Sequence, residues 1–103
     1  MKPVKRVEIV VEAAEINSLL RVLKNIGVDG YTLIRHVAGQ GERGQRRPDE
    51  FVYEVENAYF IVACEQDQAV ALVAAVRPML VKSGGMCLVS DATWVIHTGA
   101  APG

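Results

Sequence analysis

Residues 39–50, GQGERGQRRPDE, are the part of the chain whose residue types best suit the binding of an anion. Glycine lets backbone N–H groups turn towards a phosphate or a carboxylate. The guanidinium groups of Arg43, Arg46 and Arg47 can add bidentate, charge-assisted hydrogen bonds. Three acidic residues in the same segment offset these charges. The composition therefore fits either an anion-binding loop or a solvated hairpin loop, although long loops in compact domains are often functional.

Two common nucleotide motifs do not describe this segment. The chain contains no GxxxxGK[ST] sequence, so a P-loop is excluded. Residues 39–44, GQGERG, match G-x-G-x-x-G formally, but a Rossmann fingerprint must lie between a strand and a helix. Here the glycines lead into an extended arm, EFVYEVEN, so we discount the dinucleotide interpretation.

A second glycine site, KSGG at residues 82–85, lies between an expected helix and an expected strand. It has two interpretations. The structural one is a helix C-cap with glycine in a left-handed conformation. The functional one is a second phosphate-facing turn in which Lys82 supplies the charge.

No catalytic or metal-ligating set emerges from the remaining polar residues. Cys64 and Cys87 lie in apolar, strand-like runs and fit reduced core residues better than a disulfide. His36 is expected to be solvated or hydrogen-bonded rather than a ligand, and so is His97. Asp91 interrupts an apolar strand and is expected to mark a bulge near Ser90–Asp91. Trp94 is expected in the core or at a subunit interface.

The composition describes one small globular domain. The chain has 103 residues, half of them hydrophobic, and a formal net charge of −1. This charge argues against a global electrostatic attraction to nucleic acid or to an anionic membrane. No run approaches the roughly 18 apolar residues that a membrane span needs, and glutamates interrupt any signal-peptide core. We therefore expect a cytoplasmic protein that does not insert into a membrane.

The elements that would position these residues follow from hydrophobic periodicity. We expect strands at residues 7–13, 29–37, 58–65 and 86–96, and helices at residues 15–27 and 67–81. The apolar positions of the first helix, which form one stripe, are Ile16, Leu19, Leu20, Leu23 and Ile26. Gly27 should end that helix, Asp67 should cap the second, and Pro78 should shorten or bend its last turn.

This order predicts an α+β fold: a ferredoxin-like βαββαβ sandwich with a four-stranded antiparallel sheet and both helices on one face. A long loop joins strands 2 and 3. One domain is expected over residues 1–103, with a flexible segment at 39–57 and a loose tail at 97–103. Both faces of the sheet carry apolar residues, so we expect a homo-oligomer packed through sheet faces or edges.

The chain resembles the PII signalling superfamily in this layout and in three short motifs. These are GYT at residues 30–32, GQGERGQ at 39–45, like the base of a T-loop, and VKSGG at 81–85, like a short B-loop. It is most similar to the carboxysome-associated, inorganic-carbon-linked PII-like subgroup. The resemblance implies a homotrimer without catalysis that holds adenine nucleotides between subunits, with bicarbonate as a second ligand. It also implies that ligand binding orders the T-loop and so controls docking of a partner, such as a transporter or a carboxysome-related protein.

The resemblance also implies site residues. One subunit would line the nucleotide cleft with Thr32, Gly39, Gly41 and Arg43. Lys82, Ser83, Gly84 and Gly85 would approach the phosphates. Charge and location add three candidates for bicarbonate or another anion: Arg35, Arg46 and Arg47. The tail HTGAAPG holds no Arg or Lys, which favours ADP or AMP over ATP.

Two alternatives stay open. A small phosphate-ester hydrolase, acylphosphatase-like or a slow ATPase, could use the same fold. An acylphosphatase-like site needs an arginine just after the first strand, where this chain has Ala13–Ala14–Glu15. A metal-tolerance or purely structural trimer has little support, because the cysteines and histidines are far apart in the sequence.

Overall fold

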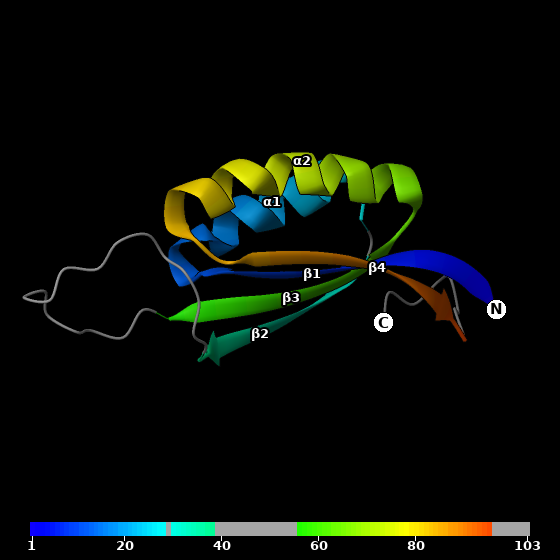
Figure 1. Ribbon diagram of the computed structural model, residues 1–103, viewed down its shortest axis with the longest axis horizontal. Helices are drawn as coiled ribbons and strands as arrows, with labels where there is room; N and C mark the ends of the chain where they lie inside the picture. Colours follow the sequence, from blue (N-terminus) through cyan, green and yellow to red (C-terminus); the bar gives the residue numbers. More distant parts are fainter. Residues whose placement is uncertain (29, 39–55, 96–103) are drawn as a thin grey trace, which may run out of the picture.

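The computed structural model describes residues 1–28, 30–38 and 56–95. The elements along these residues are β1 (Lys2–Glu12), the short 3₁₀ helix η1 (Ala13–Glu15), α1 (Ile16–Ile26), β2 (Tyr31–Val37), β3 (Asn57–Cys64), α2 (Gln66–Ser83) and β4 (Met86–Trp94). The four strands form one antiparallel sheet in the order β2-β3-β1-β4. Both helices cover the same face of the sheet (Figure 1). The predicted ferredoxin-like α+β fold is confirmed.

β1 is a central strand and begins five residues earlier than its apolar sequence indicates. It pairs with β3 over residues 5–12 and with β4 over residues 2–10. Val7, Ile9 and Val11 are buried on the helix side, while the residues between them are half-buried on the other face. The first residues, KPVKR, alternate too weakly to be read as a strand. Pairing with β4, joined from Lys5 onward by pairing with β3, extends β1 over them.

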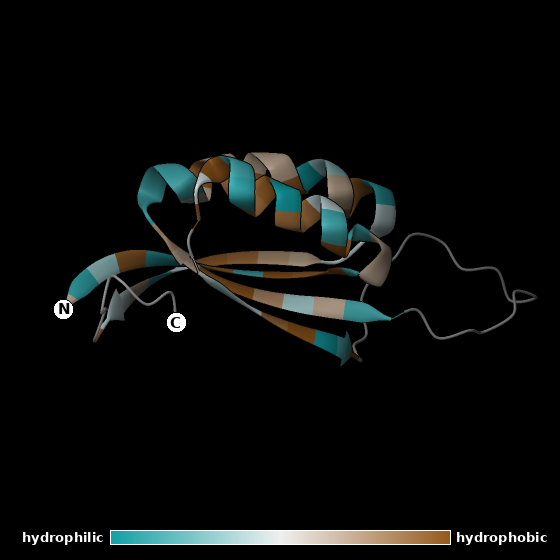
Figure 2. Ribbon diagram, turned by 180° about the vertical axis from the view of Figure 1, so that it is seen from behind, coloured by the Kyte–Doolittle hydropathy of each residue, from teal (hydrophilic) through white to brown (hydrophobic). Residues whose placement is uncertain are grey.

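The core lies between the sheet and the two helices. Ile16, Leu19 and Leu23 of α1 are buried, as the predicted stripe requires, and Leu20 and Ile26 pack at its margin. The buried residues of α2 are Ala69, Leu72 and Val76. Figure 2 shows hydrophobic and hydrophilic residues alternating along α1, as an amphipathic cover of a sheet requires.

The helix ends agree with the sequence at α1 and differ at α2. Gly27, at φ 90°, ends α1 and donates its amide to the carbonyls of Leu23 and Lys24. The expected cap Asp67 is wrong, because Glu65 caps α2 in a reciprocal capping box with Gln68.

Pro78 does not shorten α2, which continues five residues further, to Ser83. The strand bulge also lies elsewhere than expected. β4 pairs with β1 without interruption through Ser90 and Asp91, and Asp91 accepts a hydrogen bond from Lys5. The irregularity is in β2 at His36, which has a positive φ of 62°.

The remaining expectations about the described residues concern thiols and membranes. Cys64 and Cys87 are free, and burial raises the pKa of both thiols, which disfavours the reactive thiolate. Over residues 1–28, 30–38 and 56–95, no helix is long and apolar enough to cross a bilayer.

Candidate functional site

The structure describes about half of the predicted binding residues. Those it describes are Thr32, Arg35, Lys82, Ser83, Gly84 and Gly85. Those outside the described residues are Gly39, Gly41, Arg43, Arg46 and Arg47. The predicted arm at 39–57, apart from its last two residues, and the tail at 97–103 also lie outside the described part.

The KSGG segment joins the end of α2 to the start of β4. Lys82 and Ser83 belong to the last turn of the helix, and Gly84 caps it with φ 77° and ψ −178°. The amide of Gly84 donates to the carbonyl oxygen of Leu80 at 2.8 Å. The helix cap predicted here is therefore present, although its ψ is extended rather than left-handed helical. Because the helix already uses the amide of Gly84, this N–H is not available to a phosphate.

Gly85 is required by the close approach of the α2–β4 turn to β1. Its φ is 125°, and a Cβ atom added to it would lie 2.2 Å from the backbone oxygen of Val10 and 3.0 Å from a methyl group of Leu80. No side chain fits in that space, and L residues rarely adopt that φ. The glycine at this position therefore has a structural reason whether or not a ligand binds nearby.

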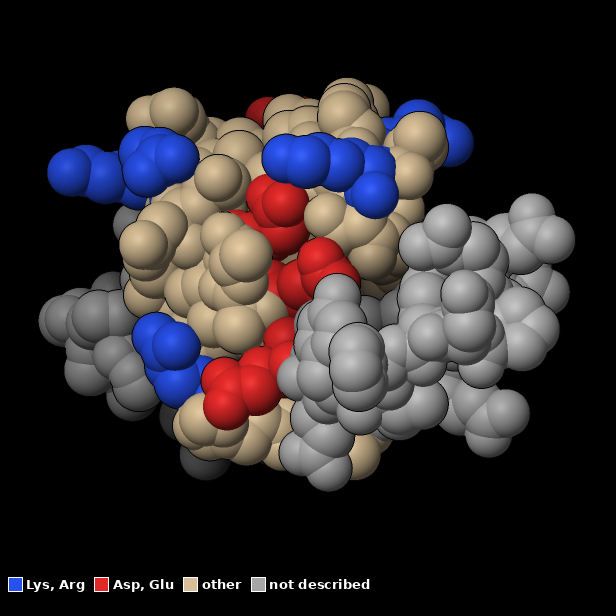
Figure 3. Space-filling view, turned by 90° about the vertical axis from the view of Figure 1, so that its left-hand side faces the viewer, with Lys and Arg blue, Asp and Glu red and all other residues tan. Residues whose placement is uncertain are grey.

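Glu15 contacts Lys82 and Ser83, the two residues that precede the glycines. Ser83 Oγ donates to Glu15 Oε2 at 3.3 Å, and Lys82 Nζ lies 4.0 Å from the same oxygen. The Glu15 side chain is 14% exposed and that of Lys82 is 79% exposed. Figure 3 looks onto this end of the molecule and shows acidic side chains gathered in its middle with basic ones around them.

Thr32 and Arg35 lie on β2, at the other edge of the sheet. Thr32 is opposite Ile61 and Arg35 is opposite the buried Ala58, so the two side chains point to different faces. β3 and β1 lie between β2 and β4. At about 4.8 Å per strand spacing, the two edges are roughly 14 Å apart. The structure therefore does not bring Thr32 together with the 82–85 segment within one chain.

Both outer strands expose apolar side chains at these edges. Tyr31 and Ile34 of β2 are 46% and 44% exposed, and Leu88 and Val89 of β4 are 53% and 46% exposed. Apolar residues of this size on two unpaired strand edges favour association with other copies.

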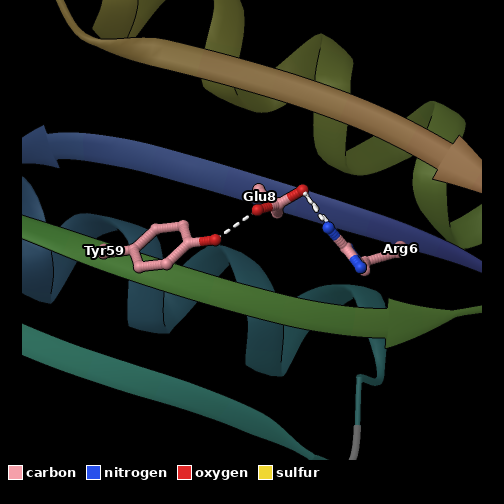
Figure 4. A network of polar contacts seen from close by, with 3 residues as sticks. All are labelled: Arg6, Glu8 and Tyr59. Carbon is pink, nitrogen blue, oxygen red and sulfur yellow. Dashed lines mark hydrogen bonds and ion pairs between the residues drawn. The ribbon is translucent and has the colours of Figure 1, made fainter.

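A polar network crosses the sheet face that the helices leave open (Figure 4). Arg6 donates to Glu8 Oε2 at 2.9 Å through Nη2 and at 3.2 Å through Nε, and the Tyr59 hydroxyl donates to Glu8 Oε1. The hydrogen bond from Tyr59, followed by that from Arg6, lowers the pKa of Glu8. The same bond to Glu8 raises the pKa of Tyr59. The carboxylate is thus held ionised beside a protonated phenol.

His36 and Trp94, which were not expected to bind ligands, contact other side chains of the protein. His36 Nδ1 lies 3.1 Å from Glu56 Oε1 at the solvent-exposed end of β2, as the hydrogen-bonded interpretation predicts. Trp94 is half-buried, with Lys2 Nζ 5.9 Å from its ring centroid. In the described part of the chain, no three His, Cys, Asp or Glu side chains are arranged to hold a metal ion.

The fold and these residues define a small ferredoxin-like α+β protein with candidate binding residues at both edges of its sheet. A family model described as nitrogen regulatory protein P-II matches residues 4–100. The chain therefore belongs to the PII family of regulatory proteins. No curated protein matches the sequence.

Solved structures of PII-like proteins share the fold. CPII from Thiomonas intermedia K12, bound to ADP, AMP and acetate, is 24% identical, with a TM-score of 0.76 over 90% of this chain and 89% of that chain. The same protein bound to ADP, AMP and bicarbonate is 25% identical, with a TM-score of 0.74 over 89% and 88%. B. subtilis GlnK is 20% identical, with a TM-score of 0.64 over 88% and 86%.

The sequence interpretation missed Glu15 as a partner of the 82–85 segment and Tyr59 as a partner of Glu8. The two contacts join residues 68 and 51 positions apart in the chain. The alternation of polar residues in β1 places Glu8 on the open face, but only the strand register puts Tyr59 near it. Nothing local in the sequence indicates the contact of Glu15.

Proposed function

We propose that this protein is a PII-like regulatory homotrimer that binds adenine nucleotides, ADP or AMP in preference to ATP, in clefts between its subunits. Bicarbonate acts as a second ligand. Binding changes the conformation of the T-loop segment, residues 39–57, and so controls docking of a transporter or a carboxysome-related protein. The protein acts in the cytoplasm without catalysis, in the regulation of inorganic-carbon uptake or carbon fixation.

The observation that carries this proposal is the separation of the two candidate groups on opposite edges of one sheet. Thr32 lies on the edge strand β2, and Lys82 is in the last turn of α2, directly before β4, the edge strand on the opposite side of the sheet. A ligand that contacts both groups has to lie between the β2 edge of one copy and the β4 edge of the next. Such head-to-tail contacts repeat from copy to copy, and they form a ring when the rotation between neighbours closes after three copies. The exposed apolar side chains on both edges support the same assembly.

The preference for fewer phosphates rests on charge. Lys82 is the basic residue of the KSGG segment, and Glu15 already lies beside it. The tail after β4 contains no Arg or Lys. CPII, at 25% identity, was crystallised with ADP, AMP and bicarbonate, which supports the same class of ligands here.

Calorimetry tests the ligand, and analytical ultracentrifugation tests the assembly. Titrations with ADP, AMP, ATP and cyclic nucleotides are repeated with and without bicarbonate. We expect a trimer with saturable heat for ADP and AMP and a weaker response to ATP. A monomer in solution, or the absence of binding heat with every nucleotide, contradicts the proposal. Steady release of phosphate from ATP would favour the hydrolase alternative instead.

A mixing experiment tests whether two subunits share each site. Thr32→Val damages only the β2 side and Lys82→Met only the β4 side, and both positions are exposed, so the fold is preserved. Each variant alone should bind ADP weakly. When the two variants are co-expressed in equal amounts, about a quarter of the clefts should be intact. Each cleft needs an unaltered β2 side from one subunit and an unaltered β4 side from its neighbour, and each of these is present in about half of the cases. If each chain holds a complete site, mixing restores none.

A further inference from the structure

The carboxylate of Glu15 contacts two side chains, those of Lys82 and Ser83, that the proposed function assigns to phosphate binding. Its Oε2 atom accepts the hydrogen bond from Ser83 Oγ at 3.3 Å and lies 4.0 Å from Lys82 Nζ. A hydroxyl and an ammonium group around one anionic oxygen are the contacts that a phosphate oxygen would also make. An anion that belongs to the chain therefore lies where an anionic ligand is expected.

The backbone around Glu15 shows that this carboxylate is directed across the fold rather than at its own helix. Glu15 is the N-cap residue of α1, but its side chain makes no capping hydrogen bond. Instead it reaches the last turn of α2, where it is 14% exposed while Lys82 remains 79% exposed. The ammonium group is open to a ligand from solvent, and the carboxylate is held beneath it.

We propose that Glu15 is a specificity-determining carboxylate that competes with the ligand for Lys82 and Ser83 and disfavours each added negative charge. This inference rests on the proposed nucleotide site and names the residue that sets its charge preference. A phosphate that binds Ser83 must displace the Glu15 carboxylate from it, and the bound phosphate is then repelled by the nearby negative charge. Because Coulomb repulsion grows with ligand charge, the penalty is largest for ATP, smaller for ADP and smallest for AMP.

The test is calorimetry on Glu15→Gln, which keeps the side-chain shape and removes the charge. Asp67→Asn is the matched control. It removes the same charge from the exposed first turn of α2, about 24 Å along the helix from Ser83. We expect Glu15→Gln to tighten ADP binding by about three- to thirtyfold, ATP by more and AMP by less. Asp67→Asn should stay within about twofold of the unaltered protein for all three, because charges that far apart are screened.

A second measurement requires no nucleotide. Amide hydrogen exchange on the ligand-free protein should be faster at Gly84 and Gly85 in Glu15→Gln, because the charged partner of the adjoining turn is lost. The same amides should be unchanged in Asp67→Asn. Unaltered exchange in both variants would overturn the contact itself.

The outcomes separate this inference from the proposed function. If the unaltered protein binds ADP but Glu15→Gln binds equally or more weakly, Glu15 is not a competitor and the nucleotide site stands. If only Glu15→Gln binds, the carboxylate excludes the ligand and the inference holds in its strongest form. Silence of both proteins towards every nucleotide rejects the proposed function and the competition together.

Discussion

Replacing Gly85 with alanine tests the close approach between the α2–β4 turn and β1. Two costs combine at this position. A φ of 125° is strained for a residue with a Cβ atom, which costs about 1–3 kcal/mol. The added carbon would also lie 2.2 Å from the backbone oxygen of Val10, which cannot rotate away. Overpacking of this kind costs about 1–3 kcal/mol more. We therefore expect the free energy of unfolding to fall by about 2–6 kcal/mol.

Two other glycines separate the strain from the clash. Gly27 has a φ of 90°, and an added Cβ atom would meet nothing within 4 Å, so Gly27→Ala carries only the conformational cost of about 1–2 kcal/mol. Gly30 has neither a positive φ nor a close neighbour, so Gly30→Ala should be neutral or slightly stabilising. The excess of Gly85→Ala over Gly27→Ala measures the clash with Val10.

Urea unfolding followed by circular dichroism, at several protein concentrations because the chain is expected to associate, measures all three variants. For Gly85→Ala the loss corresponds to a fall in Tm of at least about 8 °C for a domain of this size. Equal losses for Gly85→Ala and Gly27→Ala, within about 0.5 kcal/mol, would refute the close approach and with it the structural explanation for this glycine.

Three further predictions concern the open face, a helix cap and the core. The bond from Tyr59 lowers the pKa of Glu8, so its stabilising effect is present above the ordinary carboxyl pKa of 4.5 and is lost as pH falls through the lower folded value. Tyr59→Phe should raise the Glu8 pKa in an NMR titration and flatten the acid side of the stability profile; an unmoved pKa would contradict the network. Gln68→Ala removes the bond to the Glu65 amide and the bond to the Gly27 carbonyl, and should cost about 1–2 kcal/mol in urea unfolding. Phe60 is fully buried, so Phe60→Ala should lower the free energy of unfolding by about 3–5 kcal/mol. A loss below about 1 kcal/mol would contradict the position of this β3 side chain in the core.

The sequence predicted the fold because its signals are local. The stripe of α1 repeats every three or four residues, so it identifies the buried face before any contact is known. Gly27 follows that stripe directly and marks the left-handed end of the helix. The order of strands and helices then leaves few ways to arrange a right-handed crossover on one sheet.

Local signals failed where two plausible residues competed or where pairing decided the outcome. Glu65 and Asp67 are both acidic and both precede the apolar part of α2, and the reciprocal bond with Gln68 selects Glu65. Ser90 and Asp91 look like a break in an apolar strand, yet pairing with β1 keeps β4 regular and opposes Asp91 to Lys5. The bulge at His36 has no comparable mark in the sequence.

The candidate site depends on the tertiary structure in two ways. Composition alone assigned glycines, arginines and Lys82 to anion binding. Only the strand order places β2, which carries Thr32, and β4, which follows Lys82, at opposite edges, because neighbours in a sheet are set by topology rather than by distance along the chain. Only the packing of η1 against the end of α2 brings Glu15 to Ser83, 68 residues away. The sequence by itself therefore indicated which residue types suit an anion, and the tertiary structure decided that Glu15 lies beside Lys82 and Ser83 while Thr32 lies on a separate strand.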